Sequence, residues 1–262
     1  MKIRFSAICY QCLKEDGNTK EAYDKLVTEL GGNESYFLEI NDENIYEYEC
    51  QRGHKSFSQL SEEKYVLLFD LASLALLDGY AKEAVSTFAS AYERFVEFCI
   101  KVICINKSIA FEDFLKTWKN MIKQSERQIG AFYILQLLEF GETKYVIADK
   151  WVNFRNKVIH QGYIPKSTEA IEYGQYILTM IDLITGELKC KDSESLIKAS
   201  LYRMSENATK IGKNVSLSSS GMPTIINNRK IWLDETGKID YEKALLSMKK
   251  NSFYQHFYTK DL

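Results

Sequence analysis

The chain has 262 residues, of which 45% are hydrophobic, 27% are charged and 13% are aromatic, and only 2 are prolines. This balance fits a compact, mostly helical protein better than a disordered chain. A net charge of −2 and a pI near 6.0 argue against a general duplex-DNA coat, which needs a strongly basic face, although a local basic cleft stays open.

The cellular compartment and the redox state of the cysteines follow from the same sequence. The N-terminus lacks the pattern of a signal peptide, and no apolar run is long enough to span a bilayer. We therefore expect a cytoplasmic protein without a membrane partner. Its 6 cysteines should then be thiols or metal ligands rather than disulfides.

Residues 1–58 are expected to form a small β-rich head. Residues 2–9, 36–40 and 45–49 have the pattern of strands, and the polar cluster between the last two predicts a hairpin. Residues 20–30 predict a short helix that Gly31 and Gly32 end. A segment of this size cannot bury a large core by itself.

Four candidate metal ligands lie in this head. Cys9 and Cys12 form a CxxC motif, and Cys50 and His54 stand around a glycine turn. Each pair follows a predicted strand, as in paired zinc knuckles, and Zn²⁺ binds four such ligands as a tetrahedron. We therefore expect a structural zinc ion that replaces the missing core, and the head resembles a zinc ribbon. Free cysteines with a redox-active CxxC are the alternative.

Residues 59–190 are expected to form a helical bundle, which makes the fold mainly α. The predicted helices cover residues 62–77, 80–105, 111–123, 126–140, 142–160 and 168–188. In the second helix, an apolar stripe at steps of three and four runs from Phe88 to Val102. Glu93 lies off this stripe beside a second apolar line, so its carboxylate is expected to be partly buried and paired, or at an edge.

Residues 191–262 are expected to form a small α+β extension. A charged linker at 189–194 precedes a helix at 195–210 and a flexible loop at 216–221. Residues 224–233 predict a hairpin, and residues 241–250 predict a short amphipathic helix. The aromatic tail at 253–258 contains His256, which has no nearby partner in the sequence and is expected to be structural or exposed.

The end of the helix at 142–160 gathers chemically useful side chains. Its apolar stripe faces a core, whereas Asn156 and His160 lie on a polar stripe, and Arg155 stands between the two stripes. Gly162 ends the helix. An arginine can hold a phosphate and a histidine can transfer a proton near neutral pH, which together suffice for metal-free RNA cleavage. Such a pair is more often a simple ion-pair or capping arrangement, and that alternative stays open.

The motif at 155–160, Arg-Asn-Lys-Val-Ile-His, resembles the Arg-x4–6-His signature of the HEPN superfamily, including the polar residue after the arginine. Its flanks agree, because Gly162 and Pro165 follow and a long final helix comes next. Glu93, within residues 91–95, occupies the earlier helix from which an acidic residue often faces the motif arginine in that family. The chain thus resembles a HEPN-like helical bundle over about residues 61–188.

The resemblance implies a metal-independent endoribonuclease of a defence or toxin-type system that works as a homodimer. His160 would be the general acid or base, and Arg155 would stabilise the phosphate. Asn156 would orient the phosphate or His160, and Glu93 would hold Arg155. Cleavage at a composite dimer site would leave 2′,3′-cyclic phosphate and 5′-hydroxyl ends. An antitoxin or a phage-derived activator would be a further partner, and the head would bind RNA or a partner, or brace the dimer.

Two features depart from this interpretation. The chain has no obvious RNA track, although Lys116, Lys119, Lys123 and Arg127 could form a basic face. The nucleotidyltransferase that often accompanies HEPN toxins is absent from this chain. The alternatives are a non-catalytic HEPN-like binding or scaffold module, and a nucleic-acid-binding regulator that uses the zinc-ribbon-like head.

Overall fold

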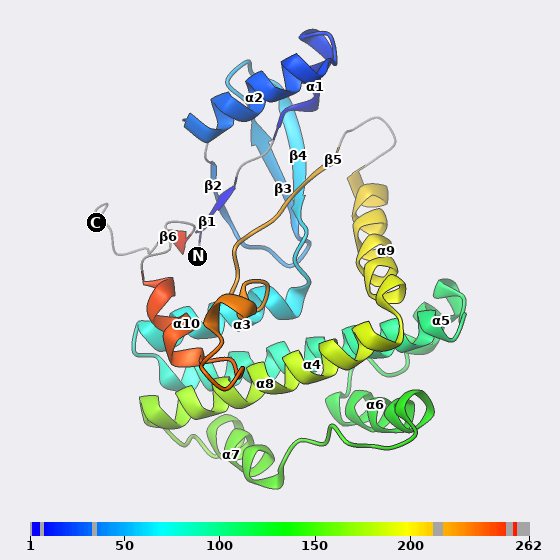
Figure 1. The fold of residues 1–262 in the computed structure, drawn as a ribbon, viewed down its shortest axis with the longest axis vertical. Coiled ribbons are helices and arrows are strands. Elements are labelled where there is room, and N and C mark those ends of the chain that lie inside the picture. Colours follow the sequence, from blue (N-terminus) through cyan, green and yellow to red (C-terminus); the bar gives the residue numbers. More distant parts are fainter. Residues whose placement is uncertain (1, 6–7, 33–35, 212–216, 250–253, 256–262) are drawn as a thin grey trace. The chain divides into compact units, whose positions relative to one another are not determined.

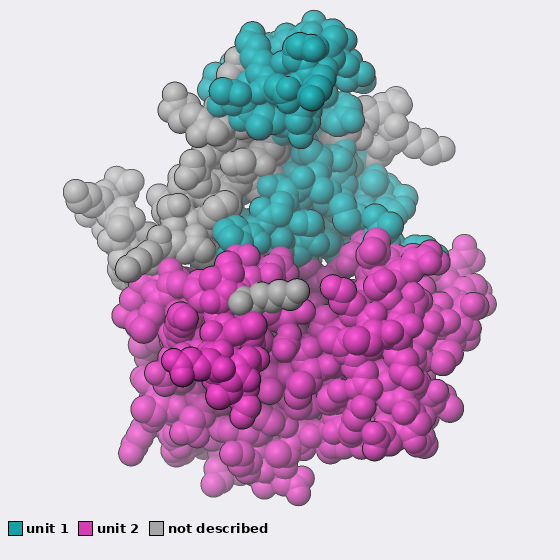
Figure 2. Space-filling model, viewed as in Figure 1, with its two compact units in different colours: residues 1–62, 201–223, 251–262 teal, residues 63–200, 224–250 magenta. Residues whose placement is uncertain are grey.

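The computed structural model describes residues 2–5, 8–32, 36–211, 217–249 and 254–255. These residues form a mainly α protein with a small β region, as the sequence predicts. Figure 2 shows two compact units. Unit 1 comprises Met1–Glu62, Leu201–Pro223 and Asn251–Leu262, and unit 2 comprises Glu63–Ser200 and Thr224–Lys250. The segments of the predicted C-terminal extension, 191–262, are divided between these two units.

Unit 1 contains two three-stranded sheets (Figure 1). In the first sheet, β1 (Lys2–Phe5) is the central strand and pairs antiparallel with β2 (Tyr36–Glu39) and β6 (Tyr254–Gln255). In the second sheet, β4 (Lys55–Leu60) is the central strand. It forms an antiparallel hairpin with β3 (Ile45–Glu49) and a parallel pair with β5 (Leu217–Ser220).

The predicted hairpin of residues 36–40 with 45–49 is wrong, because β2 and β3 belong to different sheets. The chain turns back after β3 instead, where the amide of Cys50 donates to the carbonyl of His54 at 3.0 Å. Gly53 adopts the left-handed conformation, φ 78°, that this tight turn requires. The same turn creates β4, which the sequence analysis did not predict.

Two helices complete the N-terminal part of unit 1: α1 (Tyr10–Glu15) and α2 (Lys20–Gly32). The observed strand is shorter than the predicted one at 2–9, because β1 ends at Phe5 and Cys9 is already the N-cap of α1. Residues 6 and 7 lie outside the described residues. Both helices contribute to a small core that includes three of the four candidate ligands. Its buried residues are Cys9, Cys12, Leu13, Ala22, Leu26 and Cys50.

Unit 2 is built around one long helix, α4 (Ala81–Asn106), which packs most extensively against four other helices. These are α3 (Lys64–Leu77), α6 (Ser125–Phe140), α7 (Asp149–His160) and α8 (Ser167–Lys191). The remaining helices are α5 (Phe111–Trp118), η1 (Arg229–Trp232) and α10 (Tyr241–Met248), and α9 (Ser193–Ile211) has residues in both units. No helix in the described ranges is long and apolar enough to cross a membrane.

The predicted apolar stripe of α4 forms the centre of this core. Phe88, Tyr92, Phe95, Cys99 and Val102 are all buried, with exposed fractions of 3% or less. The stripe recurs at steps of three and four, which places it on one helix face against the surrounding helices. The local pattern therefore predicts both the helix and its buried side.

Close packing of α8 on α4 and α10 depends on a glycine. A Cβ atom at Gly174 would lie 2.8 Å from Cε1 of Tyr241 and 3.0 Å from Cζ of Phe88. The rings of Phe88, Tyr241 and Phe69 pack together with centroid separations of 4.9 to 5.9 Å. The Tyr241 hydroxyl is fixed by a 2.8 Å hydrogen bond with Ser73. The three helices can approach this closely only because position 174 has no side chain.

The segment before α7 is irregular, although residues 142–160 were predicted as one helix. Residues 141–148 precede α7, and the side chain of Gln136 bonds both the amide (2.8 Å) and the carbonyl (3.2 Å) of Tyr145. The Tyr176 hydroxyl accepts from the amide of Ala148. These bonds satisfy backbone groups that a helix would have paired internally.

Two predictions for the C-terminal part are also wrong. The serine-rich segment at 216–221, predicted as a loop, includes β5. Residues 224–233, predicted as a hairpin, form a turn followed by η1, with one isolated bridge between Leu233 and Ile239. The structure describes Tyr254 and Gln255 as β6, whereas His256 lies outside the described residues.

Candidate functional site

The first candidate site is the set of four predicted ligands in unit 1. Cys9 is the N-cap of α1 and Cys12 lies in its first turn, whereas Cys50 and His54 flank the turn between β3 and β4. One ligand atom from each residue lies within 4.8 Å of all the others, and the three cysteines are buried. The fold thus gathers residues that are more than 35 positions apart in the sequence.

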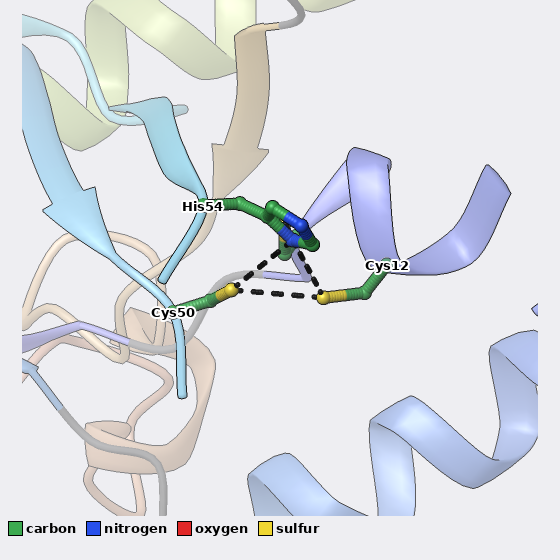
Figure 3. Close-up of side chains that lie close together, drawn as sticks. Cys12, Cys50 and His54 are labelled. Atoms are coloured by element: carbon green, nitrogen blue, oxygen red, sulfur yellow. Dashed lines mark hydrogen bonds between the residues drawn. The ribbon is translucent and has the colours of Figure 1, made fainter. Parts of the chain in front are cut away.

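The distances within this cluster match those around a tetrahedral metal. Zn–S bonds of about 2.3 Å and Zn–N bonds of about 2.0–2.1 Å give S···S separations of roughly 3.8 Å and S···N separations of roughly 3.6 Å. The Sγ atoms of Cys12 and Cys50 are 3.6 Å apart, and Nδ1 of His54 lies 3.3 and 3.6 Å from these two sulfurs (Figure 3). The same Nδ1 lies 3.8 Å from the sulfur of Cys9. The cluster can therefore hold a structural zinc ion.

The charges of the cluster also favour a cation. Burial alone would raise the pKa of Cys9, but hydrogen bonds from the Ser56 hydroxyl and the Cys12 amide lower this pKa to about 7. Burial raises the pKa of Cys12, and the neighbouring thiols of Cys50 and Cys9 raise it further. Three adjacent thiolates repel one another, whereas a bound Zn²⁺ stabilises all three.

Glu15 is a residue of this site that the sequence analysis missed. Its Oε1 lies 3.2 Å from Nε2 of His54, while Nδ1 of the same ring faces the sulfurs. A carboxylate on the distal nitrogen is the usual partner of a metal-bound histidine, since it fixes the ring orientation and tautomer. The available signal was the position of Glu15 one helical turn after Cys12, which carries little information without the fold.

The second candidate site is a cavity of about 210 Å³ within unit 2. Helices α4, α6, α7 and α8 and the segment before α7 line it. Its walls are largely apolar and come from Ala89, Ile129, Ile147, Trp151, Val152 and Tyr173. Its polar groups come from Glu93, Ser125, Glu126, Arg155 and Asn156.

Three of the predicted site residues meet at this cavity. Nη2 of Arg155 lies 2.9 Å from Oε1 of Glu93, and Nη1 donates to Oδ1 of Asn156 at 3.1 Å. The side chains of Arg155 and Glu93 are 25% and 24% exposed, so the ion pair is partly shielded from water. The expectation that Glu93 is partly buried and paired is thus confirmed, and its partner is Arg155.

His160 lies apart from these three residues. It is the last residue of α7, is exposed and does not line the cavity. It stands one helical turn beyond Asn156 and so shares a helix face with it. Gly162 follows with φ 70°, which ends the helix as predicted. Among the described residues, His160 has no hydrogen-bond or ion-pair partner, so its ring is available to another molecule.

Two of the four predicted basic residues flank, in the sequence, residues that line the cavity. Lys116, Lys119, Lys123 and Arg127 are all exposed, in α5, in the turn after it and at the start of α6. Lys116 pairs with Asp113 at 3.0 Å, and Nη1 of Arg127 donates to the carbonyl of Asn120. The cavity residues Ser125 and Glu126 lie between Lys123 and Arg127, which the sequence analysis did not connect with the site.

The chain matches no protein-family model, no curated protein and no solved structure.

Proposed function

We propose that this protein is a metal-independent endoribonuclease of HEPN type that cleaves RNA as a homodimer in a defence or toxin-type system. The observation that carries the proposal is the Arg155 guanidinium, which lines a cavity and is held there by Glu93 and Asn156. These residues come from helices that lie far apart in the sequence. Their ion pair at 2.9 Å gives Arg155 a fixed orientation without using all of its donors.

Arg155 suits a phosphate that gains charge during the reaction. A guanidinium has five N–H donors, and Glu93 and Asn156 account for two of them. The remaining donors can bond the non-bridging oxygens of a phosphate, and their geometry is already set before substrate binds. Such preorganised donors are worth about 2.7–4 kcal/mol each at comparable sites.

The proposed reaction is a transesterification that His160 assists. An imidazole takes the proton of the ribose 2′-hydroxyl while that oxygen attacks the phosphorus. The bond to the 5′-oxygen breaks, and an imidazolium supplies the proton that makes it a hydroxyl. The products are a 2′,3′-cyclic phosphate and a 5′-hydroxyl end. One histidine cannot be acid and base at once, so a second copy of the chain supplies the other.

Two exposed apolar side chains near His160 support a contact between two copies. Ile159 and Ile164 are 37% and 78% exposed on either side of the end of α7. Apolar residues gathered beside polar catalytic groups are typical of an interface rather than of a free surface. The Cys/His cluster of unit 1 would stabilise that unit, which in turn would contact RNA or a partner.

The test is RNA cleavage in EDTA by the wild type, Arg155→Ala and His160→Ala, with Lys157→Ala as a matched control. Lys157 is exposed on the same helix between the two residues but takes no part in the proposed site. We expect the wild type and Lys157→Ala to cleave RNA, and the cleavage rates of Arg155→Ala and His160→Ala to be at least 100-fold lower. The products should accept 5′-labelling by a kinase without prior phosphatase. Equal cleavage by all four proteins, or none by a dimeric wild type, would overturn the proposal.

A second candidate function is RNA or partner binding without catalysis. The exposure of His160 outside the cavity and the metal cluster of unit 1 favour it. In that case Arg155 and Glu93 would be a structural ion pair. The same experiment separates the two, because a binding protein would retain RNA without releasing cyclic-phosphate products.

A further inference from the structure

The walls of the unit 2 cavity suit a flat, mostly apolar ring. The rings of Trp151 and Tyr173, with centroids 5.5 Å apart, line it together with Ala89 and Ile129. A volume of about 210 Å³ is smaller than the roughly 300–1,000 Å³ of pockets that enclose drug-sized ligands. It therefore fits a single ring system rather than an extended ligand.

Polar groups of the cavity offer both donors and acceptors. Nδ2 of Asn156, the hydroxyl of Ser125 and the second carboxylate oxygen of Glu93 have no partner among the described residues. An apolar ligand would leave these groups unpaired, at a cost of about 1–3 kcal/mol for each buried one. The edge of a nucleobase carries matching donors and acceptors.

An anion alone does not suit the interior of the cavity. Glu93 and Glu126 both line it, and their carboxylates repel a phosphate placed there. Arg155 is bound to Glu93 on one side, so its remaining donors are the place for the phosphate. A nucleotide satisfies both conditions when its base enters the cavity and its phosphate stays at Arg155.

We propose that the cavity binds one unpaired nucleobase of an RNA strand and thereby positions the adjacent phosphate at Arg155. This inference rests on the proposed function, since it names the part of the RNA that the same site recognises. Single-stranded RNA is commonly recognised through bases that are splayed out and stacked on aromatic side chains. A base bound in this way would give the cleavage a preference for the nucleotide beside the scissile bond.

Binding can be measured without cleavage in His160→Ala protein, because His160 does not line the cavity. The probes are single-stranded RNA hexanucleotides of each base, a hexanucleotide of abasic residues, and free nucleoside monophosphates. The readout is quenching of tryptophan fluorescence, with Trp151→Phe to identify the responding residue. Val152→Phe and Ala89→Leu fill the cavity from two different helices. Val146→Phe is the matched control, because Val146 is similarly exposed but does not line the cavity.

We expect at least one hexanucleotide to bind tenfold or more tightly than the abasic strand, which corresponds to about 1.4 kcal/mol. Both filling variants should remove that advantage, and Val146→Phe should keep it within twofold. Equal affinity for the abasic strand, or no effect of either filling variant, would overturn the inference. If a free nucleoside monophosphate binds as tightly as the hexanucleotide, the claim that the bound base belongs to an RNA strand is overturned.

The two proposals fail in distinguishable ways. Base-dependent binding together with an inactive wild type leaves the cavity assignment standing and removes the nuclease. If the wild type cleaves RNA but the filling variants do not change RNA binding, the nuclease proposal stands and the cavity assignment fails.

Discussion

Replacing Gly174 with alanine tests the close packing of α8 against α4 and α10. The added Cβ would lie 2.8 Å from Tyr241 and 3.0 Å from Phe88, and both rings are fully buried and cannot move aside. Overpacking of this kind costs about 1–3 kcal/mol, from which the better helix propensity of alanine recovers roughly 0.5–1 kcal/mol. Because neither ring can move aside, the cost lies in the upper part of this range, and we expect a net loss of about 1–2 kcal/mol in the free energy of unfolding of unit 2.

Tryptophan fluorescence during heating measures this loss specifically, because all 3 tryptophans, Trp118, Trp151 and Trp232, belong to unit 2. For a unit of this size, roughly 2–4 °C per kcal/mol gives a Tm lowered by about 2–8 °C. Gly186→Ala is the matched control on the same helix, since a Cβ there meets nothing within 4 Å. That variant should gain about 0.5–1 kcal/mol. If both variants shift Tm equally and in the same direction, the packing argument is refuted.

Three further predictions concern the metal cluster, a buried hydrogen bond and a buried carboxylate. Elemental analysis of the purified protein should find about one zinc ion per chain. The variant Cys50→Ser should lose this zinc, whereas Cys190→Ser, which changes an exposed thiol outside the cluster, should retain it. Equal zinc contents in the two variants would argue against the site. Tyr241→Phe should destabilise unit 2 by about 0.5–1.5 kcal/mol in urea melts, because it removes the buried 2.8 Å hydrogen bond to Ser73, whose hydroxyl keeps its bond to the carbonyl of Phe69. Burial raises the pKa of Glu62, so the folded state holds the carboxyl proton more tightly than the unfolded state does. The free energy of unfolding should therefore fall as the pH rises from the usual carboxyl pKa through the raised pKa of the folded state. Glu62→Gln should therefore stabilise unit 1 at pH 8 but not in acid, as measured by circular dichroism in urea at both pH values; an equal effect at both would contradict the assignment.

The sequence predicts most helices of unit 2 because their signals are local. The stripe from Phe88 to Val102 repeats at the period of one helix, and its burial requires only that some other element cover it. Helix ends are predicted less well. Residues 142–148 have helical composition, but the bonds from Gln136 and Tyr176 hold this region in an irregular path. Those partners come from other helices, so no local pattern reveals them.

Strand pairing in unit 1 shows the same limit more strongly. Residues 217–220 are mostly serine and have loop-like composition, yet they pair with β4, about 160 positions away. The backbone hydrogen bonds of that partner, rather than the side chains of β5, make it a strand. The assignment of 45–49 to the wrong hairpin has a related cause, because the turn at Cys50–His54 competes with the polar turn at 41–44.

The two candidate sites were predictable to different degrees. The four metal ligands are found from residue type and spacing, because few other roles need two Cys/His pairs beside strands. The pairing of Glu93 with Arg155 was expected only through the resemblance to a family, since 62 positions separate them. Ser125 and Ile147 carry no signal of their own and reach the cavity only because α6 and α7 both pack on α4.

The order of strands in unit 1 has a consequence for how the chain is made on the ribosome. Each central strand, β1 and β4, gains one neighbour from the first 60 residues and the other from beyond residue 216. At about 5–20 residues per second, β4 waits on the order of 10–30 s for β5, with one edge open to other chains. All four metal ligands lie within the first 54 residues and emerge long before β5 is made. Metal loading of the nascent chain would therefore fix the hairpin early and shorten the time in which that open edge can aggregate.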